Sequence, residues 1–257
     1  MAFDRQGEFS GLRPIDEAGS IDLAALEAYM REHVEGFAGP LEAAQFKGGQ
    51  SNPTYRLASP SGAYVLRRKP PGKLLPSAHA VDREFRVISA LHPLGFPVAR
   101  PHVLCEDEGL IGTPFYIMDF VPGRVIWEPH VPGVGGDERA AIFEALNATI
   151  AALHDVDYTA AGLGDFGRPE GYVARQVRRW SEQYRASATA EIAEMDRLMA
   201  WLPDAAPESG QHGIVHGDFR LDNCIVHETE SRIMAVLDWE LATLGDPIAD
   251  FTYHLMQ

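Results

Sequence analysis

Cysteine and positive charge are both scarce in this 257-residue chain. The two cysteines, Cys105 and Cys224, lie far apart and form no CxxC pair, so neither a disulfide framework nor a zinc pattern is indicated. Such sparse cysteine usage favours a reducing compartment. The 37 acidic residues outnumber the 22 basic ones and give a formal net charge of −15. This balance argues against nucleic-acid binding, which needs a basic footprint, but does not exclude a local basic pocket for an anionic ligand.

Long apolar runs are also missing. No stretch of the sequence approaches the roughly 20 apolar residues that a membrane span requires. The first residues, "MAFDRQGEFSG", are charged and lack the apolar centre of a secretory signal. The length suits one large domain or two small ones. We therefore expect a cytoplasmic protein with no membrane partner.

The periodicity of apolar residues divides the chain into a strand-rich part and a helix-rich part. Ser20 is expected to cap a first helix, and strand signals then surround a second helix at residues 79–94. Two of those strands are expected to be joined by the acidic turn in "VLCEDEGLIGTPFYIMDFVPG". A Pro/Gly-rich stretch follows, and amphipathic helices come after it. We place a lobe boundary near residue 121, with an N-lobe at 1–121 and a C-lobe at 122–257.

The stretch "IVHGDFRLDNCIV" places a polar loop between two apolar strand ends. Asp218 and Asn223 lie on that loop, and a later strand, "RIMAVLD", ends in Asp238. Together they can form an oxygen-rich site of the kind that Mg²⁺ prefers. Asp218 could accept a proton from a hydroxyl nucleophile, and Arg220 could stabilise charge on a transferred group. The alternative is a β-hairpin with Asp and Asn in its turns.

The segments "HGDFRLDN" and "LDWELATLGDP" resemble the signature of aminoglycoside and choline kinases, which are relatives of protein kinases. By that resemblance Asp218 is the catalytic base, and Asn223 and Asp238 hold Mg²⁺. His216 matches the family's histidine before the loop, and we expect it to orient the loop by hydrogen bonds. The resemblance also implies ATP as the phosphoryl donor. It implies an α+β, protein-kinase-like fold with a sheet-rich, nucleotide-binding N-lobe and a mainly helical C-lobe.

Two further segments match parts of the kinase nucleotide site by their order in the chain. "FKGGQSNPTY" lies where kinases carry a glycine-rich loop, so Gly48, Gly49 and Ser51 are candidate phosphate contacts; a plain hairpin is the alternative. "FYIMDFVPG" resembles the hinge between kinase lobes, where backbone groups around Asp119 and Val121 would bind adenine. A buried edge strand explains that apolar pattern equally well.

An ion pair is expected between the third strand of the N-lobe and the helix that follows it. Kinases place a Lys at the end of this strand; here Arg67 stands in "YVLRRKP", as in choline kinases, and alternation sends Arg68 to the other face. Helical periodicity puts Glu84 inside an apolar stripe. A buried carboxylate needs a cationic partner, and Arg67 is the natural one. A Glu84 side chain that reaches solvent is the alternative.

The segments "GGQSNPTYRL" and "GLGDFGRPEGY" are similar in sequence to one branch of the family, the kinase-like domain found with acyl-CoA dehydrogenases. This resemblance implies transfer of the γ-phosphoryl group of ATP to a hydroxyl of a small molecule, with a hydroxyacyl-CoA as the candidate acceptor. An aminoglycoside-type kinase and a catalytically weak nucleotide- or acyl-CoA-binding module are the alternatives. Relatives continue beyond "DPIADFTYHLMQ", so we expect a chain truncated at its C-terminus.

Overall fold

The computed structural model describes residues 5–16, 19–48, 52–72, 79–207 and 210–256. Its backbone contacts define two compact units. The first contains residues 1–149 and 220–241, and the second contains 150–219 and 242–257. Residue 121 lies inside the first unit, so the lobe boundary expected there is not the border between these units.

A small three-stranded sheet explains why residues 220–241 belong to the first unit. Its middle strand pairs antiparallel with a strand that follows residue 121 and with a strand near the C-terminus. In sheet order these strands are β10 (Ile233–Val236), β9 (Cys224–Val226) and β7 (Arg124–Val125).

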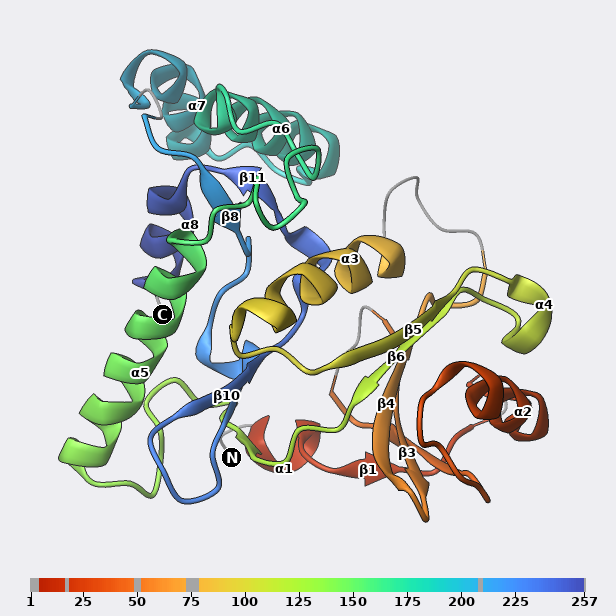
Figure 1. Cartoon of the computed structure of the whole chain (residues 1–257). Helices are drawn as coiled ribbons and strands as arrows, with labels where there is room; N and C mark the ends of the chain where they lie inside the picture. The colour runs from red at the N-terminus through yellow and green to blue at the C-terminus, as the bar shows by residue number, and fades with distance from the viewer. Residues whose placement is uncertain (1–4, 17–18, 49–51, 73–78, 208–209, 257) are drawn as a thin grey trace. The chain divides into compact units, whose positions relative to one another are not determined.

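The largest sheet of the first unit is antiparallel and has six strands (Figure 1). Sequential strands are neighbours, except that β4 pairs with β6 and leaves β5 at the edge. In sheet order the strands are β1 (Leu12–Arg13), β2 (Glu42–Phe46), β3 (Thr54–Ser59), β4 (Gly62–Arg68), β6 (Phe115–Asp119) and β5 (Pro101–Cys105).

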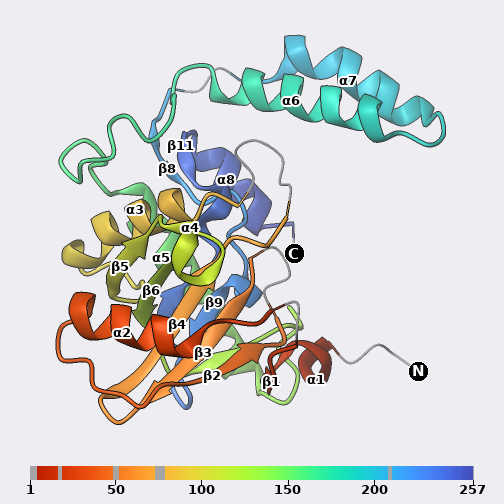
Figure 2. The same ribbon diagram turned by 90° about the vertical axis from the view of Figure 1, so that its right-hand side faces the viewer.

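Helix α2 (Leu23–His33) packs on one face of this sheet (Figure 2). Its N-cap is Asp22, whose carboxylate accepts a hydrogen bond from the Ala25 N–H at 3.0 Å. The expectation that Ser20 caps this helix is therefore wrong, because the helix starts later and Asp22 supplies the acceptor. The core between helix and sheet contains Leu26, Met30, Tyr55, Leu57, Leu66, Phe115 and Ile117.

Helix α3 (Val81–Leu91) lies on the opposite face. Leu66 belongs to the core under α2, and alternation along β4 turns Arg67 to the other side. There Arg67 meets Glu84 of α3. The α3 side of the sheet therefore carries the buried Arg67–Glu84 pair, whereas the α2 side carries the apolar core and the buried Arg68.

A short helix, α4 (Glu108–Ile111), replaces the acidic turn expected between β5 and β6. Asp107 caps it by accepting a hydrogen bond from the Gly109 N–H at 2.8 Å. Gly112 ends it in the left-handed conformation, with φ of 89°, which glycine adopts without steric cost. The acidic residues thus start a helical turn rather than a simple loop.

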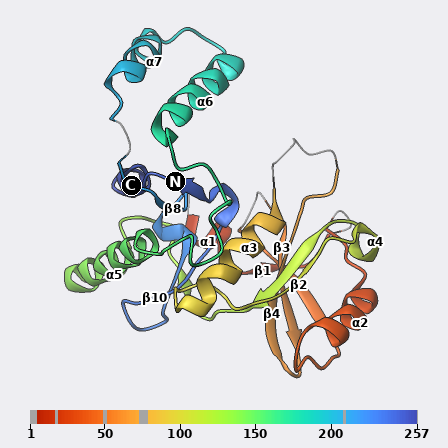
Figure 3. The ribbon, with the colours of Figure 1, turned by 45° about the horizontal axis from the view of Figure 1, so that its top comes forward.

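The second unit combines a two-stranded sheet with helices. Strand β8 (Gly213–Val215) pairs antiparallel with β11 (Thr243–Gly245). Helices α6 and α7 lie side by side (Figures 1 and 2), and Figure 3 shows the loop that joins them. The helices of this unit are the end of α5 (Gly136–His154), α6 (Tyr172–Ser187), α7 (Ala193–Ala205) and α8 (Pro247–His254).

The remaining elements are short, and all lie in the first unit. They are α1 (Arg5–Phe9), η1 (His92–Leu94), η2 (Leu221–Asn223) and η3 (Trp239–Leu241). Both cysteines are buried and free. Within the described ranges, no helix combines the length and the apolar character that crossing a bilayer requires.

Candidate active site

Asp238 follows the end of β10, where the backbone turns sharply. Its φ of 63° is left-handed, a conformation that Asp tolerates better than most residues. The preceding residue, Leu237, donates its N–H to the carbonyl of Asn223 at 2.8 Å. Val236 also pairs with Cys224 in the sheet. Sheet pairing therefore brings the backbone of Asn223 beside the residue before Asp238.

Arg67 contacts two carboxylates from distant parts of the first unit. Its Nη2 lies 2.5 Å from Oδ1 of Asp238, and its Nε lies 2.7 Å from Oε2 of Glu84. The Arg67 side chain is 9% exposed and that of Glu84 is 1% exposed. The expected Arg67–Glu84 ion pair is thus present. Arg68 turns away, and its Nε donates to Thr113 Oγ1 at 2.9 Å.

The Glu84 carboxylate has two further buried partners. Asn52 donates its Nδ2–H to Oε1 at 2.8 Å, and Tyr116 donates its hydroxyl to Oε2 at 3.1 Å. Burial raises the pKa of Glu84, and the charge of Arg67 opposes part of that shift. Burial also lowers the pKa of Arg67, but Glu84 and Asp238 raise it more, so Arg67 remains cationic.

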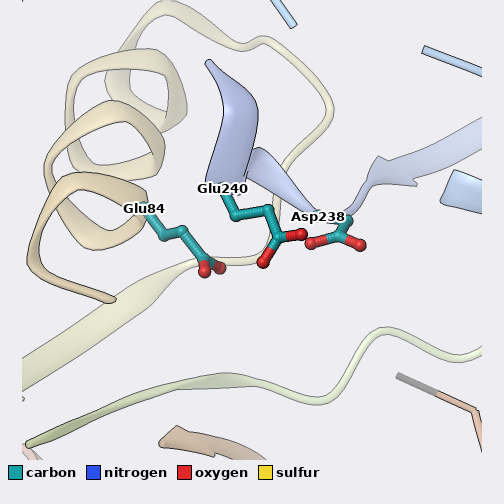
Figure 4. A group of neighbouring side chains, drawn as sticks. All are labelled: Glu84, Asp238 and Glu240. Carbon is teal, nitrogen blue, oxygen red and sulfur yellow. The ribbon is translucent and has the colours of Figure 1, made fainter. Parts of the chain in front are cut away.

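Glu240 brings a third carboxylate to the same place. Glu84, Asp238 and Glu240 each offer an oxygen, and these oxygens lie within 4.8 Å of one another (Figure 4). Helix η3, which carries Glu240, packs against α3. The formal charges of these three acids and of Arg67 sum to −3 + 1 = −2, a charge that a divalent cation would balance. Asp238 and Glu240, with Asn223 nearby, therefore fit the hard oxygen ligand set of Mg²⁺.

Sequence reasoning missed Glu240 and Asn52. A signal for Glu240 was present, because it stands only two residues after Asp238, just beyond β10. Asn52 offered no comparable signal, since an Asn after a glycine pair is typical of a turn.

The glycine-rich segment is described only in part. A Cβ at Gly48 would lie 2.9 Å from the ring of Trp127, so close packing against Trp127 explains why glycine stands there. Gly49 and Ser51, the other expected phosphate contacts, lie outside the described residues. Their role stays a prediction.

The hinge segment shows one departure from the expected adenine contacts. The Asp119 N–H donates to the carbonyl of Arg100 at 2.9 Å, so this donor is already used within the sheet. The Asp119 carboxylate lies 2.6 Å from Nε2 of His102. Adenine contacts by the Asp119 carbonyl and by Val121 stay predictions.

Arg220 lies in the first unit, where its Nε is 3.1 Å from Oδ1 of Asp222. Its guanidinium is thus held against a carboxylate on the same loop. Stabilisation of a transferred group by Arg220 stays a prediction.

In the second unit, a buried acid holds the start of the polar loop. Asp250 of α8 accepts hydrogen bonds from the backbone N–H groups of His216 and Gly217, at 2.8 and 2.9 Å, and its Oδ2 lies 3.3 Å from Nε2 of His154. Burial acts to raise the pKa of Asp250, but the bond from His154 and those backbone donors lower the pKa overall. Asp250 therefore fixes the backbone just before Asp218.

Asp218 is oriented by two neighbours in the second unit. Its N–H donates to Nδ1 of His216 at 3.2 Å, so His216 holds the loop by a hydrogen bond, which is the structural role expected for it. Its Oδ1 accepts a hydrogen bond from the hydroxyl of Tyr253 at 2.8 Å. Tyr253 is a contact that the sequence did not indicate.

Comparison with protein families gives a match over most of the chain. The family model described as "Phosphotransferase enzyme family" matches residues 42–257. Mouse acyl-CoA dehydrogenase family member 10 is 47% identical over 242 residues, which cover 94% of this chain but 23% of that protein. The chain thus spans less than a quarter of the length of that relative.

Solved structures give the same fold. A Ralstonia eutropha protein, provisionally described as an aminoglycoside phosphotransferase, is 53% identical with a TM-score of 0.84, over 92% of this chain and 70% of that one. A thermostable mutant of an aminoglycoside phosphotransferase in complex with AMP-PNP and hygromycin B is 17% identical with a TM-score of 0.60, over 88% of this chain and 74% of that one. The expected α+β, protein-kinase-like fold class is confirmed.

Proposed function

Because the chain belongs to the phosphotransferase enzyme family, we propose that it moves the γ-phosphoryl group of ATP to a hydroxyl group of a small molecule. The proposal rests on one observation: Arg67 is buried and forms ion pairs with both Glu84 and Asp238. Phosphoryl transfer depends on positioned charge around the nucleotide phosphates, and this cluster provides positioned charge at a strand end.

Asp218 is the proposed general base. It accepts the proton of the acceptor hydroxyl as the oxygen–phosphorus bond forms, while the bond between the γ-phosphorus and its bridging oxygen breaks and ADP leaves. The hydrogen bonds from Tyr253 and to His216 hold Asp218 in one orientation. Arg220 is proposed to stabilise negative charge on the group in transfer.

Asn223, Asp238 and Glu240 are the residues that would hold Mg²⁺. When bound, this ion neutralises charge on the nucleotide phosphates. Arg67 keeps the Asp238 carboxylate in place, while Glu84 stays engaged with Arg67, Asn52 and Tyr116.

The nucleotide contacts are proposed along the sheet of the first unit. Gly48, Gly49 and Ser51 would approach the phosphates, and Asp119 and Val121 would bind adenine through their backbone. The related structure with AMP-PNP supports an adenine nucleotide as donor.

For the acceptor we favour a hydroxyacyl-CoA. The similarity to an acyl-CoA dehydrogenase family member supports an acyl-CoA ligand for this chain. The similarity to the Ralstonia eutropha protein supports an aminoglycoside as the competing acceptor. Turnover with each class separates the two.

A substrate screen tests the proposal. ADP release would be measured with ATP, Mg²⁺ and a panel of hydroxyacyl-CoAs, aminoglycosides and choline-like alcohols, with the Asp218→Asn variant as control. We expect turnover with a hydroxyacyl-CoA, and a loss of about 10³-fold or more in the variant, which still folds and binds nucleotide. Nucleotide binding without turnover would favour a binding module, and near-full activity of Asp218→Asn would refute the assigned base.

A further inference from the structure

Asn52 is a fully buried polar residue outside the groups assigned to the reaction above. We infer that Asn52 is a positioning residue that fixes Glu84, and through Glu84 holds Arg67 in place for the nucleotide. The inference rests on the proposed function and adds a residue to it.

The Asn52 amide joins two groups in the first unit. Its Nδ2 lies 2.8 Å from Oε1 of Glu84, and its Oδ1 lies 2.9 Å from Nδ1 of His79. The NH₂ group of Asn52 donates to Glu84, and the Asn52 carbonyl, which can only accept, faces His79. His79 must then donate from Nδ1, which fixes its tautomer.

His79 stands two residues before α3 in a conformation that is uncommon for residues other than glycine. Its φ of 58° is left-handed, and its carbonyl accepts a hydrogen bond from the N–H of Val81, the first residue of α3. Ala80, at the N-cap position, supplies no side-chain cap. The bond to Asn52 therefore fixes the residue from which α3 starts.

The oxygens of Glu84 are divided between two sides. Asn52 binds Oε1, whereas Arg67 and Tyr116 contact Oε2. Without Asn52, Oε1 would be buried without this partner, so the carboxylate would no longer be fixed in the orientation in which Oε2 meets Arg67. Asn52 thus acts on Arg67 only through Glu84, which distinguishes it from a residue that contacts substrate.

The chemistry at position 52 requires a short neutral amide. An Asp would set one carboxylate against another, and an Ala would neither donate to Glu84 nor accept from His79. Asn52 also directly follows the glycine-rich segment and precedes β3. It therefore links that segment to α3 and to the Arg67 ion pair.

The test uses Asn52→Ala and Asn52→Asp, with Thr113→Val as matched control. Thr113→Val also removes a buried side-chain hydrogen bond in the first unit, but that bond holds Arg68 rather than Glu84. We expect the affinity for AMP-PNP with Mg²⁺ to fall about tenfold in Asn52→Ala and further in Asn52→Asp, and kcat to fall with it. The KM of the acceptor should stay within about twofold, because the acceptor does not depend on Glu84.

A double-mutant cycle separates positioning from a general structural role. In the Glu84→Gln background, Asn52→Ala should weaken nucleotide affinity less than about twofold, because its partner charge is already gone. A tenfold loss in that background as well would overturn the inference. A lower melting temperature with unchanged nucleotide affinity would also overturn it.

His79→Ala is the second variant, chosen because it spares the buried amide. His79→Ala should weaken the affinity for AMP-PNP about threefold. If Asn52→Ala fails to fold, this variant tests the role of Asn52 in its place. If the parent protein binds the nucleotide and His79→Ala binds it equally well, the inference alone is overturned. If the parent protein binds no nucleotide, the proposed function fails and the inference fails with it.

Discussion

At the scale of single residues, Arg67 has the most consequences. It is buried and contacts both Glu84 and Asp238. Removing its charge leaves those carboxylates without their counter-ion, whereas replacing it with Lys keeps the charge but loses the planar fork that reaches two acids at once.

We therefore expect Arg67→Met to lower the free energy of unfolding by about 3 kcal/mol. Arg67→Lys should cost less stability yet still weaken the affinity for AMP-PNP with Mg²⁺. Urea unfolding and calorimetric titration measure the two effects, with Lys69→Met as control for the loss of one cation. A change below about 0.5 kcal/mol in Arg67→Met, the range of an ordinary surface substitution, would show that the ion pair does not stabilise this unit.

Tyr253 tests whether the orientation of Asp218 matters. Tyr253→Phe removes only the hydroxyl that donates to Asp218 Oδ1, so we expect kcat to fall about three- to tenfold with little change in the KM of ATP. Steady-state kinetics with the acceptor found in the screen measures this. Tyr184→Phe, on α6 of the same unit, is the matched control; equal kcat in both variants would exclude an orienting role.

At the scale of elements, α8 is tied to the strand that leads to Asp218. The helix begins at Pro247 with Asp246 as its cap, and the carboxylate of Asp250 holds the backbone that follows β8. These bonds involve a buried charge, so they are stronger than neutral ones.

Asp250→Asn should lower the free energy of unfolding by about 2 kcal/mol at pH 7. The pKa of Asp250 in the folded protein lies below its ordinary value of 3.8. Its stabilisation is therefore complete above that value and is lost as the pH falls through the folded pKa. The difference between parent and variant, measured by urea unfolding, should shrink below about pH 4. A difference that stays constant from pH 7 to pH 3 would contradict this role, and Thr252→Val controls for substitution on the same helix.

Local patterns in the sequence predicted which face of the sheet or helix Arg67, Arg68 and Glu84 occupy. Strand alternation separated Arg67 from Arg68, and helical periodicity placed Glu84 in the interior. Patterns could not name partners that the chain brings from far away, such as Asn52 for Glu84 or Asp250 for His216. Helix α4 was missed because a short acidic stretch is typical of a turn, and the sequence alone does not show the capping bond from Gly109 to Asp107.

At the scale of the whole molecule, the formal charge of −15 opposes the binding of a negatively charged nucleotide. A triphosphate is repelled by an acidic protein and, more closely, by the carboxylates of Asp238 and Glu240. Arg67 is already shared by two acids. The account therefore requires a divalent cation between the phosphates and the acids at the end of β10.

Calorimetric titration of AMP-PNP, with Mg²⁺ or with EDTA, into the parent protein and Asp238→Asn tests this requirement most directly. Asp137→Asn, an exposed change of the same kind at the start of α5, is the control. We predict that the parent binds only with Mg²⁺, that Asp238→Asn binds at least about 30-fold more weakly, and that Asp137→Asn binds as the parent does. Equal binding with Mg²⁺ and with EDTA, or by Asp238→Asn and the parent, would contradict the account.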